Sequence, residues 1–145
     1  MADSPLGRTL LIANPAAHSG KGAAGAEFAH RFLGTYSSAT DGYDVRLTSR
    51  PGEATSMAAR STGYDTLIVL GGDGVIHEVV CGLMSLPHER RPRLAVLPLG
   101  SGNDYARTLG MAKNDIEGAF AQIVRGTARP VDVGRVNGTY FAETL

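Results

Sequence analysis

Residues 65–84 read DTLIVLGGDGVIHEVVCGLM, and the hydrophobic period of this run changes in its middle. Residues 67–70 are apolar at every position, which is typical of a β-strand covered on both faces. After the glycines, the apolar residues recur at the spacing of an amphipathic helix; they are Ile76, Val79, Val80, Leu83 and Met84. The run therefore predicts a buried strand, a glycine turn and a helix in direct succession.

The glycine turn, Gly71-Gly72-Asp73-Gly74, predicts a phosphate site. Glycine lets a ligand approach the backbone closely, and the first turn of a helix offers N–H groups at its positive dipole end. Asp73 adds a negative charge, and a carboxylate about 4 Å from a phosphate costs on the order of 4 kcal/mol at an effective dielectric constant near 20. Either a cation such as Mg²⁺ lies between the two, or Asp73 turns away and caps the helix.

This turn differs from the two commonest phosphate loops. The dinucleotide fingerprint requires a third glycine where the sequence has His77. The Walker pattern requires Ser or Thr after Gly-Lys, whereas Lys21 is followed by Gly22. The turn by itself therefore identifies neither kind of nucleotide-binding protein.

The composition is that of an ordinary globular domain. The 145 residues carry 14 basic and 14 acidic side chains, so the chain lacks the basic excess of a nucleic-acid-binding protein. No apolar run approaches the length of a membrane span, and residues 10–13 are too few for a signal-peptide core. We therefore expect a cytoplasmic protein without a transmembrane segment. The basic run at residues 90–93 is interpreted as a solvated connection.

Strand and helix patterns alternate along the chain, which predicts a doubly wound α/β fold: a mainly parallel sheet with helices on both faces. Strands are predicted at residues 9–13, 43–48, 67–70 and 94–97. Helices are predicted at residues 23–33, 51–60, 76–84, 104–109 and from 114 onward, the last with a core stripe that includes Ile123. Such sheets bind ligands at the carboxyl ends of their strands. The loops at residues 14–22, 48–52, 71–74 and 100–104 should therefore form one cleft.

The pattern changes after residue 126. Asn137-Gly138 lies between two strand-like runs, residues 131–136 and 139–142, and predicts a β-hairpin. The second run stops at Leu145 without the charge or proline that usually protects a sheet edge. We therefore expect an α/β domain over residues 1–128 and a hairpin over 129–145 that leads into a second, β-rich domain. The alternative is a frayed natural terminus.

Together these motifs resemble the nucleotide-binding domain of the diacylglycerol kinase catalytic family, which includes bacterial lipid kinases, sphingosine kinases and ceramide kinases. The resemblance covers nearly the whole chain in the family order. It is carried by Asn14-Pro15 with Ser19-Gly20, Thr48 with Gly52-Glu53-Ala54, Gly71-Gly72-Asp73-Gly74 with Glu78-Val79, Pro98 to Asp104 with Ala106-Arg107, and Asp132-Val133-Gly134 before Tyr140-Phe141.

The resemblance implies an ATP-binding domain followed by a β-sandwich domain that carries the general base. The expected ATP contacts are Asn14, Thr48, Gly71, Gly72, Asp73, Gly74, Val75, Glu78, Gly100, Ser101, Gly102 and Asn103. Asp73 and Asp104 are the expected catalytic carboxylates, and Asp73 is the first candidate ligand for Mg²⁺. No residue of this chain matches the family's general base. Residues 1–145 alone should therefore bind nucleotide weakly and turn over nothing.

Two positions depart from the family pattern. Val75 stands where members usually have Thr, which removes a hydroxyl worth roughly 0.5–1.5 kcal/mol as one hydrogen bond. Ser101 replaces the usual Thr of the second loop and keeps the hydroxyl. Glu78 has two open interpretations, a role in the site or a favourable charge near the start of its helix.

The resemblance implies an ATP-dependent lipid kinase that converts diacylglycerol to phosphatidic acid at the inner face of the membrane. Its partners would be ATP and a lipid, with a homodimer as an open alternative. Two other functions remain. An NAD kinase shares the glycine turn, but the stretch at residues 98–107 argues against it. A non-catalytic nucleotide-binding module would bind ATP without turnover.

Overall fold

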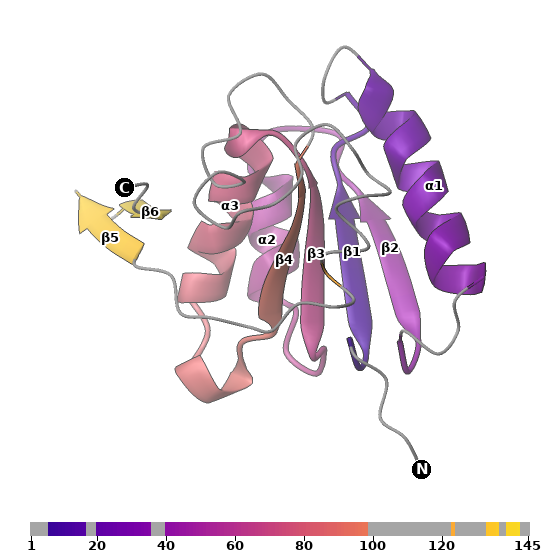
Figure 1. Cartoon of the computed structure of the whole chain (residues 1–145). Helices are drawn as coiled ribbons and strands as arrows, with labels where there is room; N and C mark the ends of the chain where they lie inside the picture. The colour runs from indigo at the N-terminus through magenta and orange to yellow at the C-terminus, as the bar shows by residue number, and fades with distance from the viewer. Residues whose placement is uncertain are drawn as a thin grey trace.

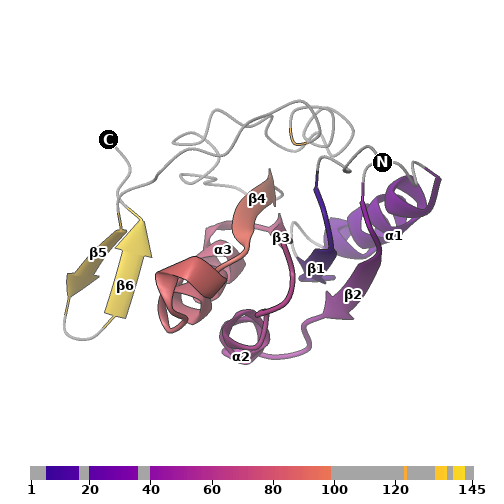
Figure 2. The same ribbon diagram turned by 90° about the horizontal axis from the view of Figure 1, so that it is seen from below.

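Four strands of the chain pair in parallel into one sheet in the order β2-β1-β3-β4. This computed structural model describes residues 6–16, 20–35, 40–98, 123, 133–136 and 139–142. The strands are β1 (Thr9–Ala13), β2 (Tyr43–Leu47), β3 (Thr66–Gly71) and β4 (Arg93–Pro98); the helices are α1 (Lys21–Thr35), α2 (Glu53–Ala59) and α3 (Asp73–Met84), with a 3-10 helix, η2 (His88–Arg90). Helix α1 lies on one face of the sheet and α2 and α3 on the other (Figures 1 and 2). The predicted doubly wound α/β fold is confirmed.

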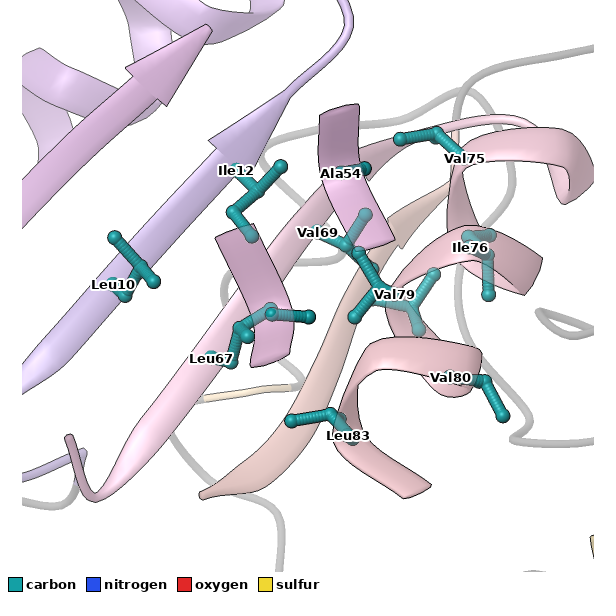
Figure 3. Packing of buried hydrophobic residues seen from close by; sticks show 12 residues of the cluster. Leu10, Ile12, Ala54, Leu67, Val69, Val75, Ile76, Val79, Val80 and Leu83 are labelled. Atoms are coloured by element: carbon teal, nitrogen blue, oxygen red, sulfur yellow. The ribbon is translucent and has the colours of Figure 1, made fainter. Parts of the chain in front are cut away.

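Alternate residues of the central strands supply two separate cores. On the α2 and α3 face, Leu10, Ile12, Leu67, Val69 and Val96 pack with the apolar side chains of those helices (Figure 3). On the α1 face, Leu11, Ala13, Ile68, Leu70 and Leu97 pack with Ala26, Ala29 and Leu33. Because both faces of β3 are covered, its apolar run does not alternate.

Helix α3 uses the predicted stripe and lies unusually close to α2. Ile76, Val79, Val80 and Leu83 are buried. At Gly82 an added Cβ would lie 2.3 Å from the carbonyl oxygen of Thr55 and 2.6 Å from Cβ of Ala58. The backbone of α3 therefore packs directly on α2, and a glycine at position 82 permits this contact.

Several helix boundaries differ from the prediction. Helix α2 begins at Glu53 instead of residue 51, because Gly52 has φ 86°, a left-handed conformation outside the helix. Helix α1 begins at Lys21 and ends at Thr35, two residues beyond the predicted range at each end. The predicted helices at residues 104–109 and from 114 lie outside the described residues, except Ile123, which is helical and packs against the α1-side core.

The basic run at residues 90–93 is only partly the solvated connection that was predicted. Arg90 is exposed. Arg91 is half-buried, and its Nε donates to the carbonyl oxygens of Leu83 and Leu86, each at 3.0 Å. Those carbonyls belong to the last turn of α3 and the segment after it, where intrahelical donors are lacking. Arg91 therefore closes the carboxyl end of α3.

Replacing Arg91 with alanine should destabilise the fold. The substitution removes charge-assisted hydrogen bonds to carbonyls that are partly shielded from water, and we expect a loss of about 1–2 kcal/mol in the free energy of unfolding. Urea denaturation followed by circular dichroism measures this loss. Arg90→Ala, the exposed neighbour, is the matched control and should change the free energy by less than about 0.5 kcal/mol. Equal effects of the two substitutions would contradict the capping role.

The amino edge of the sheet is held by polar contacts within the protein. Asp65 accepts a hydrogen bond from the N–H of Arg8 at 2.9 Å, and Thr66 Oγ1 donates to the carbonyl of Leu6 at 2.6 Å. Tyr64 donates its phenolic hydrogen to Asp44, and this hydrogen bond raises the pKa of Tyr64 above its ordinary value. These hydrogen bonds hold the amino ends of the strands in place.

A hairpin follows in the sequence. Strands β5 (Val133–Val136) and β6 (Thr139–Ala142) pair antiparallel, with Val136 opposite Thr139, as predicted. Strand β6 lies beside α3 (Figure 1). Asn137 and Gly138, the predicted turn, lie outside the described residues. No helix in the described part of the chain is long and apolar enough to cross a bilayer.

Candidate nucleotide-binding site

The first three loops of the predicted cleft begin at the same level of the sheet. Ala13 at the end of β1 is in register with Leu47 of β2 and Leu70 of β3. Gly71, the last residue of β3, is opposite Pro98, the last residue of β4. The segments that follow these strands therefore leave the sheet at its carboxyl edge, the upper edge in Figure 1.

Backbone hydrogen bonds join these loops to one another. The N–H of Asn14 donates to the carbonyl of Leu70 at 3.1 Å. Thr48 donates to the carbonyl of Ala13 through its N–H at 2.9 Å and through Oγ1 at 3.4 Å. Asn14 Oδ1 accepts from the N–H of Ala16 at 3.1 Å, which fixes the loop after β1. Asn14, Thr48 and the glycine turn are thus brought together, as the sequence predicted.

Gly71 makes the turn from strand to helix possible. Its φ is 154°, and an added Cβ would lie 2.2 Å from Cγ1 of Val75 and 3.6 Å from Cβ of Asn14. Val75 is buried with the core side chains that face α2 and α3. The side chain at position 75 therefore packs against the protein, and only the backbone of Val75 is placed to meet a ligand.

The start of α3 offers backbone donors at the edge of the sheet. The N-cap is Gly72, whose carbonyl accepts from the N–H of Ile76 at 3.2 Å. The N–H groups of residues 73–75 belong to the first turn of the helix, where backbone donors point out of the N-terminus. At Gly74 an added Cβ would meet no atom of the described residues within 4 Å, so the backbone there faces space that this part of the chain leaves open. This geometry suits an anion that approaches the helix N-terminus.

Asp73 is the first residue of α3 and is half-buried. The alternative in which Asp73 serves as the N-cap is wrong, because Gly72 occupies that position. The carboxylate therefore lies in the first turn, beside the backbone donors that would meet a phosphate. Binding of a cation between Asp73 and a phosphate stays a prediction.

Glu78 contacts another loop of the same edge. Its Oε1 accepts a hydrogen bond from the N–H of Gly52 at 2.8 Å, and its backbone carbonyl accepts from Thr55 Oγ1 at 2.9 Å. Glu53 also accepts a backbone hydrogen bond in this loop, since its Oε1 accepts from the N–H of Ser49 at 2.6 Å. Thr55 was missed from the sequence, because a threonine in a short helix gives no signal of a partner 23 residues away.

Comparison with known proteins shows the family of this chain. Residues 8–136 match the model of the diacylglycerol kinase catalytic domain. The chain belongs to this family. It is 44% identical over 104 residues to the diacylglycerol kinases of Bacillus subtilis (strain 168) and Staphylococcus aureus (strain JH9), an alignment that covers 69% of the chain and 34% and 32% of those proteins.

A solved structure agrees with the family assignment. The crystal structure of a diacylglycerol kinase from Bacillus anthracis superposes with a TM-score of 0.79 at 34% identity, over 92% of this chain and 45% of that one. The present chain thus spans about a third of the curated relatives and about half of the solved structure. The resemblance inferred from the sequence is confirmed at the level of family and fold.

The described part of this diacylglycerol kinase catalytic domain holds no group of three or more His, Cys, Asp or Glu side chains that could bind a metal ion. Mg²⁺ does not require such a group, because it is usually bound by one or two carboxylates together with phosphate oxygens and water. Asp73, with backbone donors for phosphate beside it, fits that mode of binding. The residues present are therefore compatible with Mg²⁺ that arrives with a nucleotide.

The second glycine loop of the family lies outside the described residues. It comprises Gly100, Ser101, Gly102, Asn103 and Asp104. Strand β4 ends at Pro98 beside Gly71, so the chain enters this loop at the same edge of the sheet. The approach of the two glycine loops to one phosphate group remains a prediction.

Proposed function

We propose that this chain is the ATP-binding part of a longer lipid kinase that transfers the γ-phosphoryl group of ATP to the hydroxyl of diacylglycerol. The observation that carries the proposal is the start of α3: a glycine turn places backbone donors and Asp73 at the carboxyl edge of the sheet, next to the loop of Asn14, which is followed along this edge by Thr48. Membership of the diacylglycerol kinase catalytic domain family and the names of the relatives support a lipid hydroxyl as acceptor.

Phosphoryl transfer requires mainly that the phosphates be positioned and their charge stabilised. The N–H groups of residues 73–75 would donate to phosphate oxygens, and the open space at Gly74 would let those oxygens approach. Asp73 would hold Mg²⁺ directly or through water. When bound, Mg²⁺ would supply the positive charge that offsets both the carboxylate and the phosphates.

The acceptor hydroxyl must lose its proton during the reaction, and no residue of this chain has been matched to that task. We propose that the base lies in a second, β-rich domain that follows the hairpin of residues 129–145. The α/β domain would then occupy residues 1–128. The lipid would approach from a membrane surface to which a cytoplasmic enzyme binds peripherally. The homodimer expected as an alternative stays a prediction.

The proposal is tested by phosphate transfer from γ-labelled ATP. The longer protein should label diacylglycerol in phospholipid vesicles when Mg²⁺ is present and should leave NAD unlabelled. The 145 residues alone should label neither acceptor, because the base and half of the cleft are expected elsewhere. Labelling of NAD and not of lipid would favour the NAD kinase alternative, and ATP binding without labelling of either would favour a regulatory module.

A further inference from the structure

The side chain of Glu53 closes the loop between β2 and α2. Its Oε1 accepts hydrogen bonds from the N–H of Ser49 at 2.6 Å and from Ser49 Oγ at 3.2 Å. The N–H of Glu53 donates to the carbonyl oxygen of Arg50 at 3.4 Å. The main chain and the side chain of Glu53 thus hold residues 49–53 in one turn.

The hydrogen bonds to Ser49 contribute more to this turn than the nearby ion pair. Oε2 of Glu53 lies 4.0 Å from Nε of Arg50, and the side chain of Arg50 is 80% exposed whereas that of Glu53 is 24% exposed. An ion pair with one exposed partner is weak, because water screens its charges. A short hydrogen bond from a backbone N–H to a carboxylate is charge-assisted and stronger. The carboxylate of Glu53 therefore acts mainly on Ser49.

Ser49 directly follows Thr48, the residue of this loop that is expected to contact ATP. Thr48 donates to the carbonyl oxygen of Ala13 through its N–H at 2.9 Å and through Oγ1 at 3.4 Å. Thr48 is therefore attached to β1 on one side and, through Ser49, to the start of α2 on the other. A residue held from both sides loses less conformational freedom when a ligand binds.

We infer that Glu53 is a positioning residue, which holds Ser49 and thereby orients Thr48 at the nucleotide site. This inference rests on the proposed function, since ATP is the ligand that Thr48 would meet. The requirement at position 53 is then a side-chain oxygen that reaches the N–H of Ser49. A carboxylate that acted directly on the ligand or on Mg²⁺ would instead require its negative charge.

Two substitutions at position 53 separate these requirements. Glu53→Ala removes the acceptor, whereas Glu53→Gln keeps an oxygen with the same reach. Both remove the charge from the first turn of α2, so both lose the same interaction with the helix dipole. In the 145-residue chain, amide exchange of Ser49 measured by NMR should be about tenfold faster in E53A, the order expected for loss of one charge-assisted hydrogen bond. In E53Q it should stay within about threefold of the wild-type rate.

Glu27→Ala is the control, because it removes an exposed carboxylate from α1. Exchange at Ser49 in E27A should equal that of the wild type. Unchanged exchange at Ser49 in E53A would overturn the inference, since the hydrogen bond would then not hold the loop.

Kinetics of the longer protein test the consequence for ATP. E53A should raise the KM for ATP about fivefold with kcat within about twofold, because Thr48 would be correctly oriented for a smaller fraction of the time. E53Q should restore most of the wild-type KM. An unchanged KM in E53A would contradict the inference, and so would an E53Q variant with a KM as high as that of E53A. If the wild type phosphorylates no lipid, the proposed function fails, while exchange at Ser49 still decides whether Glu53 holds the loop.

Discussion

Replacing Asp73 with alanine should lower the kcat of lipid phosphorylation by the longer protein by about 10²–10³, close to the limit of detection. Asp73 lies in the first turn of α3, beside the backbone donors of residues 73–75. Its loss would remove the carboxylate that is proposed to hold Mg²⁺, and removal of one preorganised electrostatic contact costs about 10²–10³ in rate. Transfer of label from γ-labelled ATP to diacylglycerol measures the effect.

A carboxylate at the opposite edge of the sheet provides the control for this experiment. Asp41 is exposed and precedes β2 at the amino edge. Asp41→Ala should therefore leave kcat within about twofold of the wild type. Circular dichroism should show that D73A is folded, since an acidic residue in the first turn contributes only about 0.3–1 kcal/mol to a helix. Near-normal turnover of a folded D73A protein would refute the proposed role.

The second large effect is expected on stability, at Gly82. Ala is ordinarily favoured over Gly inside a helix by about 1 kcal/mol. Here the added Cβ would lie 2.3 Å from the carbonyl oxygen of Thr55, a backbone atom that cannot move without shifting α2. Overpacking costs typically 1–3 kcal/mol, and more where backbone must move. We expect Gly82→Ala to lower the free energy of unfolding by about 2 kcal/mol and the melting temperature by roughly 5–10 °C.

Gly74 offers a matched control on the same helix. Within the described ranges an added Cβ at Gly74 meets no atom within 4 Å, so Gly74→Ala should be neutral or stabilising by up to about 1 kcal/mol. Differential scanning calorimetry of the two variants of the 145-residue chain makes the comparison. A G82A protein as stable as G74A would show that α2 and α3 are not packed as closely as described.

The elements with strong periodicity could be predicted from the sequence. The unbroken apolar run of β3 and the helical stripe of α3 follow from local spacing, because a strand covered on both faces and a helix covered on one face leave different patterns. The start of α2 was predicted less accurately than these elements. Pro51 suits the first turn of a helix, but Gly52 has a left-handed conformation, so the helix begins at Glu53.

The site could be predicted as a set of loops, but its internal contacts could not. Parallel strands bring their carboxyl ends to one edge, which is why Asn14, Thr48 and the glycine turn meet. The bond between Glu78 and Gly52 joins residues 26 positions apart, and its geometry depends on how α3 packs on α2. Likewise, the capping role of Arg91 depends on the path of the chain after α3.

Two genetic selections would distinguish the roles of Gly74 and Gly82 in α3. In the first selection, a library that randomises each position is selected only for folded, protease-resistant protein. The survivors should have glycine at position 82, while position 74 should accept other residues. When the same library is selected for phosphorylation of lipid, the survivors should also have glycine at position 74, because any side chain there would occupy the space proposed for a phosphate. Sequencing the survivors would thus distinguish the glycine that the helix pair requires from the glycine that the ligand requires.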